Sequence, residues 1–208
     1  MSIQAVVFDI GNVLVEWSPE QFYDAQIGAD RRRAFFDAVP IETMNTEVDR
    51  GAPFAQSVAD LARAHPDWHD EIMLWQTGWP QMYAPQIDLS VHLLHALRAK
   101  GVPVFSLTNF GIETYEIGAD IYPVMRAFDR DFISGHMRVI KPDPRIYEML
   151  EEGSGLSGDA LIFTDDRAEN IAAAAARGWR THLFDGPQGW ADRLVAEGLL
   201  TREEARQG

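Results

Sequence analysis

Acidic and polar side chains follow three short apolar runs of the sequence, at the points where buried strands are expected to end. Asp9 comes after the first run, Thr108-Asn109 after the second and Asp165-Asp166 after the third. Short runs rich in Val, Ile, Leu and Phe are typical of buried strands. Because open α/β sheets bind their ligands at the carboxyl ends of the strands, these side chains are expected to meet at one edge and form a site there.

A lysine adds a positive charge to this set. Lys141 opens the segment Lys141-Pro142-Asp143-Pro144, which begins a helix between the second and third runs. Each member alone has a simpler explanation, as a turn residue, a helix N-cap or a solvated lysine. Together, acidic side chains from two strand ends, a hydroxyl–amide pair and a lysine at one sheet edge are poorly explained by chance.

The rest of the chain supplies the elements that would position these residues. Buried-strand patterns alternate with helical patterns of roughly 10–15 residues, which is typical of a parallel, doubly wound sheet of the α/β class. The strands are expected at 5–8, 102–107, 131–134, 160–163 and 179–184. The helices are expected from 88 to 101, around 112–117, after 144, and at 168–177.

The stretch between the first and second runs has a different pattern. Helical segments are expected at 18–27, at 30–38, from Pro53 onward and around Trp68–Trp75, with a polar turn at Asp49-Arg50-Gly51. No strand pattern is found between residues 17 and 85, so an all-helical insertion in the α/β host is expected.

Aromatic and other large side chains gather near the end of this insertion, and they invite the interpretation of a substrate box. Packing of a helical core on itself is the simpler explanation. One or two residues of the insertion must nevertheless face Asp9 and select the substrate, and the pattern does not indicate which. The side chains in question are Trp68, Trp75, Trp79, Met82 and Tyr83.

Composition limits the class of partner. The 208 residues carry 18 basic and 32 acidic side chains, a net charge of −14. Such a field repels nucleic acid and anionic membranes, so neither is an expected partner, and an anionic substrate would need a local positive centre, a metal ion or a placed lysine. No apolar run approaches the ~18 residues of a transmembrane helix, and no basic region of a signal peptide precedes the first strand. With no cysteine, thiolate metal sites and cysteine nucleophiles are excluded, and a cytoplasmic location is expected.

In order and spacing, these segments resemble the four motifs of the haloacid dehalogenase-like (HAD) hydrolase superfamily, over nearly the whole chain. The insertion resembles the helical cap of the family's cap-type-1 members. Among these, the closest likeness is to the Asp-x-Gly-Asn-Val branch, which includes a bacterial α-glucose-1-phosphate phosphatase. The matching segments are Phe8–Val13, Ser106–Asn109, Lys141–Tyr147, and Phe163–Asp166 followed by Glu169-Asn170-Ile171.

The resemblance implies a Rossmann-like HAD core formed by residues 1–16 and 87–208, with a helical cap formed by residues 17–86. It also implies a hydrolase that acts with Mg²⁺ on small phosphorylated metabolites, for example a sugar 1-phosphate. The exact substrate and the oligomeric state do not follow from it.

The resemblance further implies a role for each motif residue. Asp9 would attack phosphorus and form an aspartyl phosphate that water then hydrolyses. Lys141, Thr108 and Asn109 would bind the phosphoryl oxygens, the last through its backbone N–H or its amide. Lys141 would also screen Asp9 from the downstream acids. The ligands of Mg²⁺ would be Asp9, Asp166 and the carbonyl of Gly11, with Asp165 acting directly or through water.

One position departs from the family pattern. Most phosphatases of the superfamily have a second aspartate two residues after the nucleophile, where it serves as general acid and base, and here Gly11 occupies that position. Such a proton carrier is typically worth about 10²–10⁴-fold in rate. A sugar 1-phosphate, whose leaving group is less basic, would need less help. Alternatively Glu16 reaches in, although a solvated side chain is the simpler interpretation of Glu16.

Two other functions remain open. A 2-haloacid dehalogenase shares the aspartate nucleophile and the Lys-Pro-Asp-x-Arg-x-Tyr segment, but it needs no metal and does not carry the paired acids of the fourth motif. Without a cation, Asp165-Asp166 and Asp9 would repel one another. A non-catalytic binding or regulatory protein that kept the fold is favoured only by Gly11.

Overall fold

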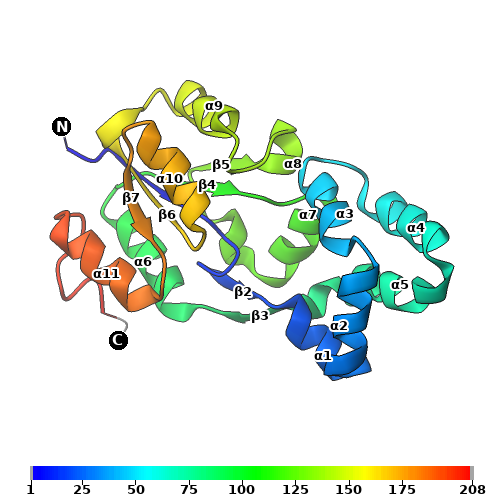
Figure 1. The fold of residues 1–208 in the computed structure, drawn as a ribbon. Coiled ribbons are helices and arrows are strands. Elements are labelled where there is room, and N and C mark those ends of the chain that lie inside the picture. Colours follow the sequence, from blue (N-terminus) through cyan, green and yellow to red (C-terminus); the bar gives the residue numbers. More distant parts are fainter. Residues whose placement is uncertain (1, 207–208) are drawn as a thin grey trace.

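The computed structural model describes residues 2–206, and within that range five parallel strands form one sheet (Figure 1). The strand order is β5-β4-β1-β6-β7, so the first strand of the chain lies at the centre. The expected Rossmann-like parallel α/β sheet is therefore confirmed. The strands are β1 (Ala5–Phe8), β4 (Val104–Thr108), β5 (Arg130–Ile133), β6 (Leu161–Asp165) and β7 (Arg180–Leu183).

Helices cover both faces of the sheet, as alternate residues of β1 indicate. Val6 and Phe8 belong to an apolar cluster with side chains of α6 (Asp88–Ala99) and α11 (Pro187–Ala196). Ala5 and Val7 belong to a second cluster with α9 (Pro144–Ser154) and α10 (Ala168–Ala176). Since successive side chains of a strand point to opposite faces, β1 is buried between two layers of helices.

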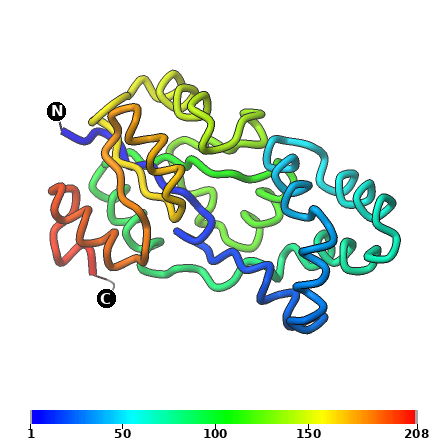
Figure 2. Tube along the Cα trace, viewed as in Figure 1, coloured from blue at the N-terminus to red at the C-terminus, as the bar shows by residue number. Residues whose placement is uncertain are grey.

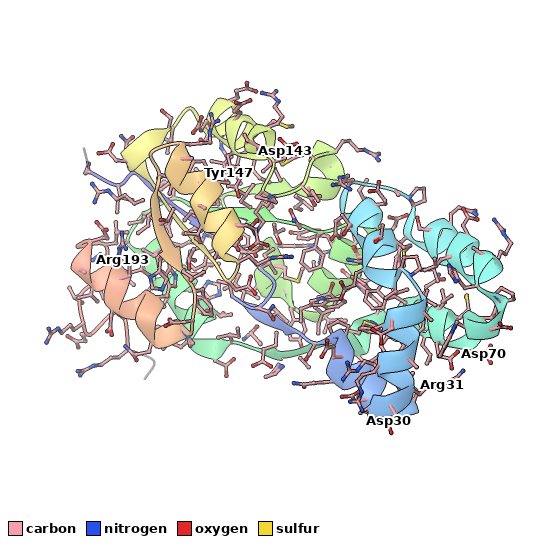
Figure 3. The ribbon with its side chains drawn as sticks, viewed as in Figure 1. Asp30, Arg31, Asp70, Asp143, Tyr147 and Arg193 are labelled. Atoms are coloured by element: carbon pink, nitrogen blue, oxygen red, sulfur yellow. The ribbon has the colours of Figure 1, made fainter. Side chains whose placement is uncertain are left out.

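The start of α9 shows how the sequence sets an element that bears on the site. The side chain of Asp143 caps the helix by accepting a hydrogen bond from the backbone N–H of Arg145, and Pro144 occupies the first turn. Further along α9 lies Tyr147, which is labelled in Figure 3. It packs into the second cluster and donates its hydroxyl to the carbonyl of Asn170 on α10, at 3.0 Å. The segment that carries Lys141 is thereby tied to the helix that follows β6.

The insertion lies beyond one end of the sheet, on the side away from both chain ends (Figures 1 and 2). The chain leaves the sheet after β1 and returns to it at α6. Among residues 2–206, no helix is long and apolar enough to cross a membrane. The helices of the insertion are α1 (Pro19–Ile27), α2 (Ala29–Ala38), α3 (Ile41–Asp49), α4 (Phe54–Ala64) and α5 (His69–Thr77).

The prediction that no strand lies between residues 17 and 85 is wrong. β2 (Val15–Trp17) and β3 (Tyr83–Gln86) pair antiparallel where the chain leaves and re-enters the core, with Trp17 opposite Tyr83. Pro85 disfavoured a strand in the sequence pattern, because proline has no backbone N–H to donate to a β ladder. A two-stranded ribbon tolerates proline, since each of its strands has one unpaired edge.

Three helices differ from the predictions. α3 was not predicted, and because it ends at Asp49, only Arg50-Gly51 of the expected polar turn Asp49-Arg50-Gly51 form a turn. The short α8 (Ser134–Met137) and the whole of α11 were not predicted. The remaining short helices are 3₁₀ turns: η1 (Pro66–Trp68), η2 (Trp79–Met82), η3 (Pro123–Arg126) and η4 (Gly158–Ala160).

Most of the large side chains near the end of the insertion are buried, as the packing interpretation predicted, whereas Trp68 is only partly buried. Trp75, Trp79 and Tyr83 are each at most 3% exposed, and their rings contact one another and Trp17. Tyr83 also stacks on Phe110 of the core, with ring centroids 5.7 Å apart. One apolar cluster therefore runs from the sheet face into the insertion. The division into domains at residues 17 and 86 stays a prediction.

Candidate active site

Three strand ends meet at one edge of the sheet. Asp9 directly follows β1, whose last residue Phe8 is aligned with Ser106 of β4 and with Thr164 of β6. The backbone N–H of Asp9 donates to the carbonyl of Thr164 at 3.0 Å. Thr108 and Asp165, the last residues of β4 and β6, therefore lie beside Asp9 at the carboxyl edge of the sheet.

Lys141 bridges the acids of two strand ends. Its Nζ lies 2.9 Å from Oδ1 of Asp9 and 2.6 Å from Oδ2 of Asp165, and its side chain is fully buried. Nζ also lies 5.5 Å from the centroid of the Phe163 ring. Burial alone would lower the pKa of Lys141, but the charges of Asp165 and Asp9 outweigh it and raise the pKa above its usual value. Lys141 is therefore held as a cation.

Asn109 fixes the backbone of Lys141. Its Oδ1 accepts from the backbone N–H of Lys141 at 2.8 Å, and its Nδ2 donates to the carbonyl of the same residue at 3.1 Å. The amide of Asn109 is thus engaged with protein, which leaves its backbone N–H for a ligand. The loop after β4 and the segment that carries Lys141 are held as one unit by this pair.

Asp165 is saturated with donors. Lys141 and Asn170 donate to its Oδ2, while Asn170 and the backbone N–H of Arg167 donate to its Oδ1. A carboxylate has about four lone-pair sites, so these four contacts occupy them all. Asp165 is also fully buried. A direct bond from Asp165 to a ligand would therefore displace one of its present donors.

The acids form a cluster that fits a divalent cation. One oxygen each of Asp9, Asp165 and Asp166 lies within 4.8 Å of the others. Burial raises the pKa of Asp9 to about 7, Lys141 opposes this, and the charges of Asp165 and Asp166 raise it further. Burial also raises the pKa of Asp166, although a hydrogen bond from Asn12 opposes it. The single positive charge of Lys141 does not balance the negative charges of three carboxylates. A divalent cation with oxygen ligands would supply the missing positive charge.

The cluster opens into a pocket of about 610 Å³, a volume suited to a small molecule. From the edge of the sheet, the pocket is lined by Asp9, Gly11, Thr108, Asn109, Lys141 and Asp166. From the insertion, the lining includes Trp17, Asn45, Asp49, Trp75, Trp79 and Tyr83. The structure thus brings all the predicted site residues together, with Asp165 behind Lys141 rather than in the pocket wall.

Asn12 contributes more than the turn that its sequence context indicated. Its backbone is left-handed, with φ of 56°, a conformation that asparagine tolerates better than most residues. Its Nδ2 donates to Oδ2 of Asp166 at 3.0 Å, and its Oδ1 accepts from the backbone N–H of Trp17 at 2.9 Å. Asn12 therefore ties an acid of the cluster to the strand that enters the insertion.

Polar residues of α3 also line the pocket, Asn45 and Asp49 among them, and they were not predicted to belong to the site. They lie in a segment without a motif, and the spacing of four residues between Asn45 and Asp49 is that of any helix face. Glu16, the alternative proton carrier, lies on β2 and its side chain is exposed. The pocket-lining residues nearest to it on either side in the sequence are Asn12 and Trp17, and Glu16 is not among the lining residues.

Comparison with known proteins gives this arrangement a family context. The chain is 25% identical over 193 residues to the sesquiterpene phosphatase astK of Aspergillus oryzae, covering 88% of this chain and 91% of that protein. It is also 25% identical over 212 residues to phosphatase MT3486 of Mycobacterium tuberculosis, covering 95% of this chain and 94% of that protein.

A solved structure shares the fold. The HAD family enzyme bt-2542 of Bacteroides thetaiotaomicron, in its magnesium complex, superposes with a TM-score of 0.73 at 19% identity, over 93% of this chain and 99% of that one. The same enzyme is also known in complex with magnesium and inorganic phosphate. The family model of the haloacid dehalogenase-like hydrolases matches residues 3–178, and the chain belongs to this family of hydrolases.

Proposed function

We propose that this hydrolase is a Mg²⁺-dependent phosphatase of small phosphorylated metabolites, working through an aspartyl phosphate on Asp9. The observation that carries the proposal is the buried bridge from Lys141 to Asp9 and Asp165 beside a third acid, at the floor of a pocket for a small molecule. Two relatives named as phosphatases, and a neighbour of the same fold that binds magnesium and phosphate, support it.

The residues that would hold Mg²⁺ are Asp9, Asp166 and the carbonyl of Gly11. All three line the pocket, and Mg²⁺ commonly takes one or two carboxylates together with water and substrate phosphate. Asp165 would act only through water, because its oxygens are already bonded to Lys141, Asn170 and the backbone of Arg167. When bound, the cation would neutralise the charge of the phosphoryl group and of the acids around it.

The residues of the chain can perform the two displacements that follow. Asp9 accepts hydrogen bonds from Ile10 and Lys141 through Oδ1, so Oδ2 is the oxygen that would attack phosphorus. Lys141, the hydroxyl of Thr108 and the backbone N–H of Asn109 would bind the phosphoryl oxygens as charge develops on them. Water then cleaves the aspartyl phosphate and restores Asp9.

The substrate class includes sugar phosphates, and a sugar 1-phosphate remains the first example to test. Aromatic walls formed by Trp17, Trp75 and Trp79 face polar side chains of α3 across the pocket, a combination that suits a ligand with both apolar faces and hydroxyls.

A 2-haloacid dehalogenase is the second candidate. It would use the same nucleophile and the same lysine, but its chemistry gives no role to Asp166. Asp166 lines the pocket, is half-buried and lies within 4.8 Å of Asp9 and Asp165. A third acid at that distance opposes an anionic substrate unless a cation is bound, which favours phosphoryl transfer.

Steady-state hydrolysis of an aryl phosphate, with Mg²⁺ or with a chelator, tests the proposal. We expect turnover only with Mg²⁺. Asp9→Asn should lower kcat by about 10³-fold or more, because the nucleophile is lost. Asp166→Asn should raise the Mg²⁺ concentration needed for half-maximal rate by about 10-fold or more, since a charged ligand is lost.

Two outcomes would contradict the proposal. Wild-type protein without phosphatase activity over a panel of phosphate esters would remove the function, and unchanged Mg²⁺ dependence in Asp166→Asn would remove the metal assignment. Release of halide from 2-chloropropionate without metal would favour the dehalogenase instead.

A further inference from the structure

The proposed reaction needs a proton for the leaving oxygen, and the usual carrier is absent. Gly11 stands where most phosphatases of the family have an aspartate. A Cβ built on Gly11 would meet no other atom of the described residues within 4 Å, and the backbone there is not left-handed. The glycine is therefore not required by packing, and the space beside the nucleophile is open to a proton carrier from elsewhere.

The acids of the pocket outside the strand-end cluster are Glu42, Asp49 and Glu169. Glu42 and Glu169 are exposed, and Glu169 accepts a hydrogen bond from Arg167 at 2.7 Å. Asp49 is half-buried and is the least exposed of the three. It lies at the last turn of α3, on the side of the pocket formed by the insertion.

Asp49 is held in place by the core rather than by the insertion alone. Its carbonyl accepts from Oγ of Ser134 at 2.7 Å, and the carbonyl of Gly51 accepts from the guanidinium of Arg138. The carboxylate of Asp49 accepts from the backbone N–H of Gly111, just past the end of β4. The end of α3 is thus fixed to the loops that follow β4 and β5, which also support Thr108 and Lys141.

A second set of contacts orients the carboxyl group. Nδ2 of Asn45, one turn earlier on α3, lies 3.3 Å from Oδ2 of Asp49. Oδ1 of Asn45 in turn accepts from Nε1 of the buried Trp75 at 3.2 Å. A ring of the aromatic wall therefore fixes the amide, and the amide fixes the acid. Such support is expected where an acid must point in one direction.

Burial leaves this acid partly protonated at neutral pH. Burial raises the pKa of Asp49 to about 7, with the backbone N–H of Gly111 and the charge of Arg50 opposing it. Across the pocket, the charge of Asp9 raises it and that of Lys141 lowers it. The phenol of Tyr83 faces the same group, and its own pKa is raised well above the usual value by burial and then by Asp49. An acid that titrates near 7 can both give and take a proton.

We propose that Asp49 is the catalytic proton carrier of this phosphatase, in place of the aspartate missing at Gly11. The assignment rests on the proposed function. As Oδ2 of Asp9 bonds to phosphorus, the bond from phosphorus to the leaving oxygen breaks, and that oxygen takes the proton of Asp49. Water then attacks the aspartyl phosphate and gives a proton to the Asp49 carboxylate, the bond between phosphorus and Asp9 breaks, and phosphate leaves.

This assignment widens the substrate class. An enzyme without a proton carrier is confined to esters with good leaving groups, such as aryl phosphates and sugar 1-phosphates. With Asp49 as carrier, esters of ordinary alcohols also become substrates. The wild-type rate should then depend only weakly on the basicity of the leaving group.

The test compares an aryl phosphate with an alkyl phosphate in wild type and in Asp49→Asn, with Mg²⁺ present. We expect Asp49→Asn to lower kcat/KM for the alkyl ester by about 10²-fold or more, and for the aryl ester by much less, because only the alkyl leaving group needs the proton. Wild-type kcat/KM for the alkyl ester should fall as the pH rises through about 7, and this limb should be absent in Asp49→Asn.

One matched variant controls for the change of charge, and two further variants test where the proton comes from. Glu47→Gln makes the same chemical change two residues away on α3, at an exposed side chain that pairs with Arg50, and should leave both esters unaffected. Glu16→Gln tests the other acid near the entrance. Gly11→Asp in the Asp49→Asn background places a carboxyl in the open space and should restore part of the alkyl rate.

The outcomes separate this assignment from the proposed function. Wild type inactive toward both esters would end the proposed function itself. Wild type active, with Asp49→Asn equally reduced on both esters or on neither, would overturn only the role of Asp49. Selective loss of the alkyl ester in Glu16→Gln, and not in Asp49→Asn, would transfer the role to Glu16. Retained aryl activity shows that Asp49→Asn is folded.

Discussion

The two walls of the pocket hold their acids in different electrostatic surroundings, one with a paired cation and one without. At the sheet edge, the charges of Asp9, Asp165 and Lys141 are buried together and satisfy one another at 2.6–2.9 Å. In the insertion, Asp49 has no cation within ion-pairing distance among the described residues and is surrounded by amide, backbone and aromatic groups. Burial raises the pKa of Asp9 and of Asp49 alike to about 7, but only Asp9 has a lysine beside it that opposes this rise at ion-pairing distance.

This difference indicates which surroundings suit an acid that acts as nucleophile or metal ligand and which suit an acid that carries a proton. A nucleophile and its metal ligands must be anionic at working pH, so they need a lysine and a cation beside them. A proton carrier must instead change its charge during turnover, so it benefits from a site without a permanent counter-ion. Although the two kinds of acid lie on separate elements, the charge of Asp9 still raises the pKa of Asp49 across the pocket.

The largest effect should come from removing the cation that holds the sheet-edge wall together. Lys141→Met leaves Asp9 and Asp165 buried without their partner, and breaking such a bridge typically costs about 3–5 kcal/mol. We expect a loss of that order in the free energy of unfolding, measured by urea denaturation without metal at neutral pH. Activity should be lost as well.

A matched lysine separates this effect from a general loss of charge. Lys100 pairs with Glu204 at 2.9 Å on the surface, with the two side chains 35% and 39% exposed. Lys100→Met should cost under about 1 kcal/mol, since exposed pairs contribute little. If Lys141→Met were no more destabilised than Lys100→Met, the buried bridge would not hold the wall together.

A smaller effect, opposite in sign between the walls, should follow from neutralising one aspartate in each. Asp165→Asn should destabilise the protein by about 1–3 kcal/mol, because Lys141 loses a partner and the amide cannot accept from all the donors around it. Asp49→Asn should stabilise it by about 1 kcal/mol at pH 8 and leave it unchanged at pH 4, because it removes an acid that burial disfavours when ionised.

The sign for Asp49 follows from its two pKa values. Burial raises its pKa from 3.8 to about 7 on folding, so Asp49 makes the wild type lose stability as the pH rises from about 4 through 7, and Asp49→Asn lacks this contribution. Urea denaturation at both pH values, without metal, gives the comparison. Destabilisation of Asp49→Asn at pH 8 would mean that the carboxylate is paired in the fold and that the contrast between the walls is wrong.

The sheet-edge wall could be predicted from the sequence because its residues sit where the local pattern ends. A short apolar run predicts a buried strand, and the residue after it lies at the ligand-binding edge whatever the rest of the fold does. Asp9, Thr108 and Asp165 are placed by that rule alone. The pairing of Asn109 with the backbone of Lys141 depends on contacts over a long sequence separation and was not predicted.

The residues of the insertion that line the pocket were harder to predict from the sequence, for a physical reason. Helices place side chains by rotation about an axis, and which face meets the pocket depends on how each helix packs on the core. Asp49 therefore resembles any acid at the end of a helix until Ser134 and Gly111 are seen to hold it. The β2–β3 ribbon escaped prediction in the same way, because its strands are short and one carries Pro85.

The central claim is that Asp9 becomes phosphorylated during turnover. Rapid acid quenching of wild type with an aryl phosphate and Mg²⁺ during the first turnover, followed by mass spectrometry of the proteolysed protein, tests it directly. We expect the peptide that contains Asp9 to gain the mass of one phosphoryl group, and the same peptide of Asp9→Asn to gain none. Hydrolysis at the full rate with no phosphoryl group on that peptide at any quench time would contradict the claim.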